Sequence, residues 1–368
     1  MKPTTYWNKV TEELVEYNVR LTNESNKKLH GDFNKVRRDI FKDLSMYFDW
    51  ISEEGKLDIQ RLNAKMTRAE REAFQESIQS FLKSNGEDLS KNFAHMLKKA
   101  GDMGFLTKSM AIRWEIYKHV DLLYEKVEEE IRTIIQKTYI ENYYRSIFNV
   151  SRFEGMGDFK RIKFSDVQKI TLTPWVEGQS NFQGRLLRDK LQTVNELESK
   201  ISQYAVQGKT AKEAQEEIAK IIDKAERKTA TLNQWENAHF SNQAMGVAYE
   251  EGTSEEYQII ATLDLNTTPK CRKEDKKIYK HEEKVIGETY PPFEGHKCRS
   301  VAIPYYDYEL DYGRRGKTRM ARNPITGKSE RVSDMNYREW YSRYVESSDE
   351  AKEIERKLKE KKRRRKKA

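Results

Sequence analysis

The two cysteines of the chain, Cys271 and Cys298, lie in one segment, Asp264–Arg299, together with His281 and His296. Thiolate and imidazole groups are the usual ligands of tetrahedral zinc. A structural zinc site needs four ligands, and Cys271, His296 and Cys298 would supply three of them. The candidates for the fourth ligand are His281, Asp264 and Asp275.

The spacing of these residues leaves three interpretations open. The cysteines are 27 residues apart, His296 lies two residues before Cys298, and the C-x2-C spacing of zinc fingers is absent. The pair is therefore either two ordinary thiols, part of a zinc site, or a disulfide that forms once the protein has left the cell.

Known catalytic motifs are incomplete in this segment. His281 and Glu283 satisfy the H-x-E half of the zinc deaminase signature, but the P-C-x-x-C half is missing. A cysteine nucleophile would need His296 as its general base. Residues two apart on a strand lie on the same face, and a histidine in that position is rarely placed to accept the proton of Cys298. We expect a protein that is not an enzyme. The alternative is a zinc- or thiol-dependent enzyme that acts on nucleic acid or protein.

The positive charge of the chain is concentrated at its carboxyl end. The net charge is +9, and residues 357–368 contain nine basic residues and one acidic residue, a charge of +8. Clustered lysines and arginines bind phosphates through counterion release, so we expect this tail to be disordered and to bind DNA. The predicted DNA-binding residues are Lys357, Lys359, Lys361, Lys362, Arg363, Arg364, Arg365, Lys366 and Lys367.

The elements that must position these residues are predicted to be mainly helical. Apolar residues spaced three or four apart predict a helix from Phe33 to Ile51, and a longer one that begins near Ser109. Thr67 and Glu70 form a capping box before a shorter helix. Further helices are expected at 183–206, from Thr210 through Ile222, and at 232–252.

Strands are expected only around the cysteine segment. Residues 257–263 form the best strand candidate, and 277–279 and 300–306 are shorter ones. The predicted fold is mainly α with a small α+β module. An elongated helical region, 1–160, precedes a compact module of helices and short strands at 161–306. An extended segment with a short helix carrying Trp340 and Tyr344 follows at 307–350, and a basic disordered tail at 351–368.

The sequence carries no sign of export or membrane insertion. The amino terminus lacks the apolar core of a signal peptide, and no stretch approaches 18 apolar residues. Two cysteines in 368 residues argue against a disulfide framework. We therefore expect synthesis in a reducing cytoplasm and no membrane partner.

The order of motifs resembles that of the phage minor head proteins, the head-morphogenesis family that includes the Mu protein F-like group. That module has an Asp, a Thr and a Cys after a strand, an Asp-Gly turn, and a PP-x-H-x-x-Cys-Arg ending. The matching residues here are Asp264, Thr267, Cys271, Asp275, Pro291, Pro292, His296, Cys298 and Arg299. Lys276 stands where the family usually has Gly, Asn266 stands where Arg is common, and His296 lies one residue nearer the cysteine than usual.

Softer matches flank this segment in the family's order. They are Tyr6-Trp7, Pro174-Trp175, Asn181-Phe182, Gly208-Lys209-Thr210, Asn237, Tyr249, Gly252 and Trp340-Tyr341. The resemblance implies a structural minor head protein of a tailed bacteriophage, inside the capsid near the portal, that acts in head assembly and DNA packaging or delivery. The portal protein, other head components and packaged double-stranded DNA are its implied partners, and it would be made in the host bacterial cytoplasm. A free DNA-binding protein is a third interpretation, but no helix-turn-helix or OB-type signal supports it.

Overall fold

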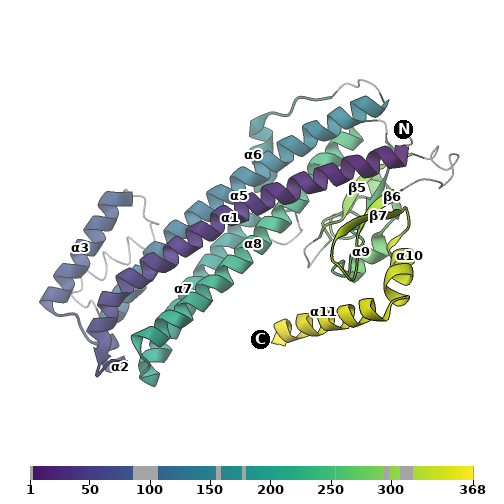
Figure 1. Cartoon of the computed structure of the whole chain (residues 1–368). Coiled ribbons are helices and arrows are strands. Elements are labelled where there is room, and N and C mark those ends of the chain that lie inside the picture. Colours follow the sequence, from purple (N-terminus) through teal and green to yellow (C-terminus); the bar gives the residue numbers. More distant parts are fainter. Residues whose placement is uncertain are drawn as a thin grey trace. The chain divides into compact units, whose positions relative to one another are not determined.

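A computed structural model describes residues 3–85, 107–154, 159–175, 180–252, 254–293, 298–306 and 318–367. Long helices dominate it, as the apolar spacing predicted, and small antiparallel sheets follow toward the carboxyl end (Figure 1). The long helices are α1 (Pro3–Ile51), α5 (Lys108–Glu154), α7 (Phe182–Gln207) and α8 (Ala211–Glu250). None of the described helices is long and apolar enough to cross a membrane.

Shorter elements connect these helices. After α1, the two-residue strands β1 (Ser52–Glu53) and β2 (Lys56–Leu57) form a tight turn in which Gly55 has φ +77°. The helices α2 (Ile59–Asn63) and α3 (Arg68–Asn85) come next, and α6 (Phe164–Leu172) precedes α7. The predicted capping box is present, because Thr67 N–H donates to Glu70 and Glu70 N–H donates to the Thr67 hydroxyl.

The chain divides into two compact units, each built from separated segments. Unit 1 comprises residues 1–26, 130–182 and 231–368, and unit 2 comprises residues 27–129 and 183–230. The helices α1, α5 and α8 each contribute residues to both units. The predicted break between the helices at 210–222 and 232–252 is absent, because α8 runs through both ranges without a Gly or Pro in between.

In unit 2, the apolar stripe predicted from Phe33 to Ile51 is buried. Phe33, Ile40 and Ile51 are at most 1% exposed. Polar side chains are paired across the helices of this unit: the Tyr47 hydroxyl donates to Glu115, and Lys190 Nζ lies 2.6 Å from an Asp121 carboxylate oxygen. These contacts hold the first half of α5 against its neighbours.

In unit 1, a seam of asparagine and serine side chains runs along the helices. Asn18 of α1 and Asn142 of α5 donate amide N–H groups to each other, and Asn18 also donates to Ser241 of α8. Apolar residues pack beside this seam, among them Trp7, Met245 and Tyr249. The amino-terminal part of α1 therefore lies along the carboxyl-terminal parts of α5 and α8 (Figure 1).

The small sheets of unit 1 follow α8. Strand β3 (Glu256–Ile260) is central, with β4 (Ile278–Lys280) and β5 (Val301–Tyr305) antiparallel to it on either side. The three predicted strands are thus confirmed. A short helix, α9 (Pro269–Glu274), and a 3-10 turn, His281–Glu283, lie in the connections. The sheet packs Tyr257, Ile259 and Ala302 into a core with both cysteines.

A second hairpin closes the module. Strands β6 (Thr318–Arg322) and β7 (Ser329–Ser333) pair with each other, and α10 (Tyr337–Tyr341) continues into a π-helical turn, Ser342–Glu346. The predicted short helix is confirmed, and its Trp340 is fully buried in a third apolar cluster with Leu263 and Val332.

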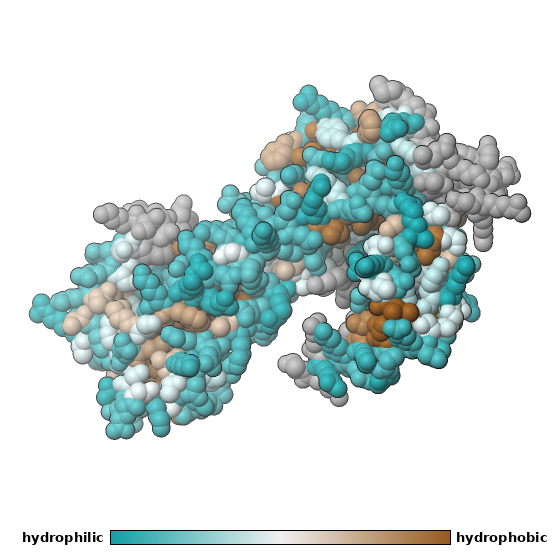
Figure 2. Space-filling view, in the orientation of Figure 1, coloured by the Kyte–Doolittle hydropathy of each residue, from teal (hydrophilic) through white to brown (hydrophobic). Residues whose placement is uncertain are grey.

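The carboxyl-terminal tail differs from the prediction, because it is helical rather than disordered. Helix α11 spans Asp349–Lys367. Ion pairs three or four residues apart stabilise its first half, including Arg356 with both Glu353 and Glu360. Ala351 is buried against the third apolar cluster and anchors the helix to the module. Charged and polar residues cover most of the molecular face shown in Figure 2, as expected for a chain in which 35% of residues are charged.

Candidate functional site: a cysteine pair beside two carboxylate–arginine pairs

The site begins at the turn after β3. Thr268 caps α9 by accepting the N–H of Cys271, and Pro269 occupies the first helical turn, where it needs no N–H partner. This short helix directs Cys271 into the apolar core under the sheet. Cys298 precedes β5 and reaches the same core.

The two predicted ligand cysteines are brought together. Their sulfur atoms lie 3.8 Å apart, no disulfide joins them, and they are 3% and 7% exposed. Burial raises the pKa of the Cys298 thiol well above its ordinary value, and the neighbouring Cys271 raises it further. A thiol with a raised pKa stays protonated at neutral pH, so Cys298 is not an activated nucleophile.

The sulfur spacing suits a shared metal ion. Two thiolates bound tetrahedrally to zinc at about 2.3 Å are about 3.8 Å apart, which is the separation found. The other predicted ligands are placed differently. His296 lies outside the described residues, and His281 Nδ1 lies 3.5 Å from a carboxylate oxygen of Glu250. Among the described residues, no Asp, Glu or His ligand atom lies within 4.8 Å of both sulfurs.

Asp264 is buried and forms an ion pair with Arg299, whose side chain is partly exposed. The guanidinium donates to both carboxylate oxygens, at 2.6 and 2.8 Å, and the N–H groups of Asn266 and Thr267 donate to the same carboxylate at 2.9 Å. Burial alone would raise the pKa of Asp264, but the hydrogen bonds and charge of Arg299 bring it below the ordinary value. The carboxylate therefore fixes the turn between β3 and α9.

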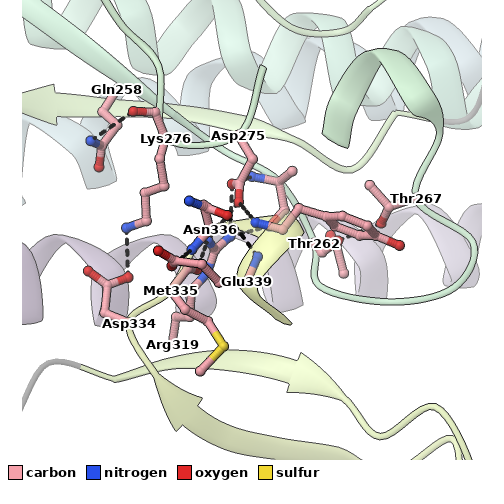
Figure 3. A network of polar contacts seen from close by, with 12 residues as sticks. Gln258, Thr262, Thr267, Asp275, Lys276, Arg319, Asp334, Met335, Asn336 and Glu339 are labelled. Carbon is pink, nitrogen blue, oxygen red and sulfur yellow. Dashed lines mark hydrogen bonds and ion pairs between the residues drawn. The ribbon is translucent and has the colours of Figure 1, made fainter. Parts of the chain in front are cut away.

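Asp275 forms a second and deeper ion pair, with Arg319 of β6 (Figure 3). The guanidinium nitrogens lie 3.0 and 3.1 Å from the two carboxylate oxygens. The carboxylate also accepts the N–H groups of Ala261 and Tyr337, both at 2.8 Å. Arg319 additionally donates to the carbonyls of Met335 and Ala261. One carboxylate thus connects β3, β6 and α10.

Lys276 continues this network. Its backbone has φ +66°, a left-handed conformation that glycine adopts more easily than lysine. Its ammonium group lies 2.7 Å from Asp334, which lies just before α10 (Figure 3). Burial lowers the pKa of Lys276, and the positive charge of Arg319 lowers it further. This turn is the one in which glycine was expected from the resemblance.

The hydrogen bonds that the Asp264 and Asp275 carboxylates already accept leave little room for a metal ion. Each carboxylate already accepts a bidentate guanidinium and two backbone N–H groups, so metal binding would require it to give up an arginine. Sequence reasoning singled out both aspartates but missed Arg319 and Tyr337. The sequence of β6 gives no signal for Arg319, because its residues do not alternate between apolar and polar, although the strand buries Arg319 and Ala321.

The predicted DNA-binding residues lie on α11 and fall into two groups. Lys357 and Lys359 are paired with Glu353 and Glu355, at 3.5 and 2.8 Å. Lys361, Arg363 and Arg364 are exposed, and no ion pair is found for them among the described side chains. The backbone of Lys362, Arg365, Lys366 and Lys367 continues the same helix.

Comparison with known proteins gives one match. Residues 195–303 match the family model described as phage Mu protein F-like protein. No match was found among curated proteins or among solved structures. The matched region begins within α7, includes α8, β3, β4 and both cysteines, and ends within β5. Residues 195–303, somewhat less than a third of the chain, are therefore similar to the phage Mu protein F-like family.

Proposed function

We propose that the chain is a structural minor head protein of a tailed bacteriophage. It takes part in head assembly and in the packaging or delivery of DNA, from a position inside the capsid near the portal. The match over residues 195–303 carries this proposal. The bidentate network around Asp275 supports a structural role, because the polar groups of the matched module are used to hold elements together.

The test of this role is association with assembled heads. Heads purified from infected cells should contain the chain, and mild disruption should release it together with a ring-shaped portal oligomer. Absence from purified heads, with the protein recovered only from the host cytoplasm, would contradict the proposal.

We further propose that the end of α11 binds packaged double-stranded DNA. The exposed cations Lys361, Arg363 and Arg364 have no carboxylate partner among the described side chains, whereas those of the first half are neutralised. Free cations displace the counterions of DNA more effectively than paired ones, which must first lose their carboxylates.

Two variants with equal loss of charge test this difference. Replacing Lys361, Arg363 and Arg364 by Gln should weaken binding to a DNA duplex and reduce the salt slope of log K by about 2.7. The matched control replaces Lys352, Arg356 and Lys357, which are paired with Asp349, Glu353 and Glu360, and should change the slope less. Equal effects of the two variants, or no DNA binding by the full chain, would refute the proposal.

We propose that Cys271 and Cys298 are ligands of a structural zinc ion. The 3.8 Å separation of their sulfurs supports this, and their burial in the module core suits a structural site. His296 is the third ligand predicted from the sequence. Elemental analysis of the purified chain should find about one zinc per molecule, and Cys271→Ser and Cys298→Ser should each lose it. A full chain purified without chelators that contains no zinc would exclude the site.

A further inference from the structure

A cavity of about 530 Å³ lies within unit 1, among α1, α8 and the loops that precede α9 and β5. This volume falls in the range of small-ligand sites, about 300 to 1,000 Å³. Cys298, Arg299 and Ser300 form part of its wall, so the cavity lies next to the cysteine pair but is not part of the ion-pair network around Asp275.

Carboxamide side chains come from three of the four walls of this cavity. They are Asn18 and Asn23 of α1, Gln234, Asn237 and Asn242 of α8, and Asn266 of the loop before α9. Those of Asn18, Asn237 and Asn242 are bound to other groups of the module and the helices. Within the described part of the chain, no hydrogen-bond partner is found for the side chains of Asn23, Gln234 and Asn266.

Ser300 adds a buried hydroxyl to the same wall. The residue is 2% exposed, and its Oγ has no hydrogen-bond partner among the described residues. Leaving such a group unpaired costs about 1–3 kcal/mol. The hydroxyl lies just beneath the cavity surface, and rotation of the Ser300 side chain would let it hydrogen-bond a ligand and recover that loss, which favours an occupant with polar groups.

The wall chemistry excludes several kinds of occupant. None of the described residues that line the cavity is aromatic, so sugars and nucleobases would find no stacking surface. The charged lining residue is Arg299, whose guanidinium is already held by Asp264, so phosphate would meet no uncompensated cation. No carboxylate lines the cavity among these residues, which disfavours cations and basic peptides.

The remaining chemistry matches a peptide backbone. A carboxamide offers one acceptor and one donor group, as a peptide unit does, so carboxamides on opposite walls complement an extended chain. The apolar lining side chains Val15, Val19, Ala238 and Val301 are small or medium in size, which favours ligand residues with small side chains. We propose that this cavity binds an extended, uncharged polypeptide segment with small side chains. The assignment of that segment to another head protein rests on the proposed function.

The experiment measures binding of a defined peptide to the full, isotope-labelled chain by NMR. The probe is the capped, uncharged tetrapeptide acetyl-Gly-Asn-Ser-Ala-amide, and inorganic phosphate, methyl glucoside and a DNA duplex are the comparison ligands. The peptide should shift the side-chain amide signals of Asn23, Gln234 and Asn266, and the comparison ligands should not.

Two cavity variants and one control complete the design. Ser300→Ala should weaken peptide binding by about tenfold while leaving thermal stability unchanged or raised, because it removes a hydroxyl that is unpaired without ligand. Ala238→Leu should abolish binding by filling the cavity. Ser199→Ala, in the charged groove of unit 2 lined by Glu196, Lys200 and Lys224, should have no effect.

The proposal is overturned if the peptide shifts none of these signals, if phosphate, glucoside or DNA shifts them instead, or if Ser300→Ala binds the peptide unchanged. Each result is independent of whether the chain is found in phage heads, so the binding site and the proposed function fail separately.

Discussion

Asp275 and Arg319 show what a buried ion pair costs when one partner is lost. Arg319 is 3% exposed, and the carboxylate that it holds is surrounded by backbone groups. Arg319→Met keeps the side-chain volume but leaves Asp275 buried without a cation. We expect this variant to lose about 3–5 kcal/mol of unfolding free energy, measured by urea denaturation.

The control for this prediction is a more exposed pair in the same unit. Arg331 is half exposed and lies 2.7 Å from Glu12. Arg331→Gln should cost less than Arg319→Met, because water screens the half-exposed Arg331 guanidinium. If Arg319→Met lowers the free energy of unfolding no more than Arg331→Gln does, the buried pair contributes little to stability.

Lys276 allows backbone strain to be separated from side-chain contacts. Both Lys276→Ala and Lys276→Gly remove the contact with Asp334, but only glycine adopts φ +66° without a steric penalty. We expect the glycine variant to be more stable than the alanine variant by about 1 kcal/mol. Thermal unfolding of the two variants measures the difference. An alanine variant more stable than the glycine variant would show that the backbone at Lys276 is not strained.

The residues of the site were only partly predictable. Asp264 and Asp275 stand out because they occupy turns beside a recognisable strand, and the cysteines because they are the chain's two cysteines. Their partner Arg319 is not recognisable from local pattern, since 44 residues separate it from Asp275 and the pairing depends on tertiary packing.

At the scale of elements, periodicity predicted the helices and strands but not their continuity. The three strands and the helix with Trp340 were found because their apolar patterns are local. The single long helix α8 and the helical tail were missed. Residues 224–231 of α8 are mostly polar, which obscured the continuity of this helix. The strongly basic composition of the tail obscured the stripe of Ala351, Ile354 and Leu358 that packs against the third apolar cluster.

The hairpin β6–β7 and helix α10 are integral to the module, although the matched region ends before them. A chain that ends at Tyr306 would lack Arg319, Tyr337 and Trp340, which leaves Asp275 without its cation and opens the apolar cluster around Leu263. We expect this truncation to abolish the cooperative unfolding of the three-stranded sheet. Hydrogen exchange at the amides of β3 measures this, and protection equal to that of the full chain would show that the hairpin is dispensable.

At the scale of the whole molecule, carboxylates with lowered pKa values occur in both units. The pKa of Asp43 in unit 2 is about 2: burial raises it, but His119 and Lys118 lower it more. The pKa of Glu250 in unit 1 is also about 2. The hydrogen bond with His281 lowers this pKa most, burial raises it, and Lys284 lowers it further.

A lowered pKa stabilises the folded protein above the unfolded-state pKa, near 4, and this stabilisation disappears as the pH falls toward 2. We expect the melting temperature to fall steeply between about pH 4 and pH 2. The variant Asp43→Asn with Glu250→Gln should be less stable at pH 6 and should show a shallower fall. An unchanged pH profile in this variant would mean that other carboxylates control acid unfolding.

The ion pair between Asp275 and Arg319 also sets an order of events during synthesis. Arg319 leaves the ribosome 44 residues after Asp275. At about 5–20 residues per second, this interval lasts roughly 2–9 s. After Tyr305 and before Arg319 has been made, the three-stranded sheet is complete but the cation that neutralises Asp275 is absent. The module therefore closes only after β6 has been made, and a ribosome that stalls between β5 and β6 leaves an open sheet exposed to aggregation and proteolysis.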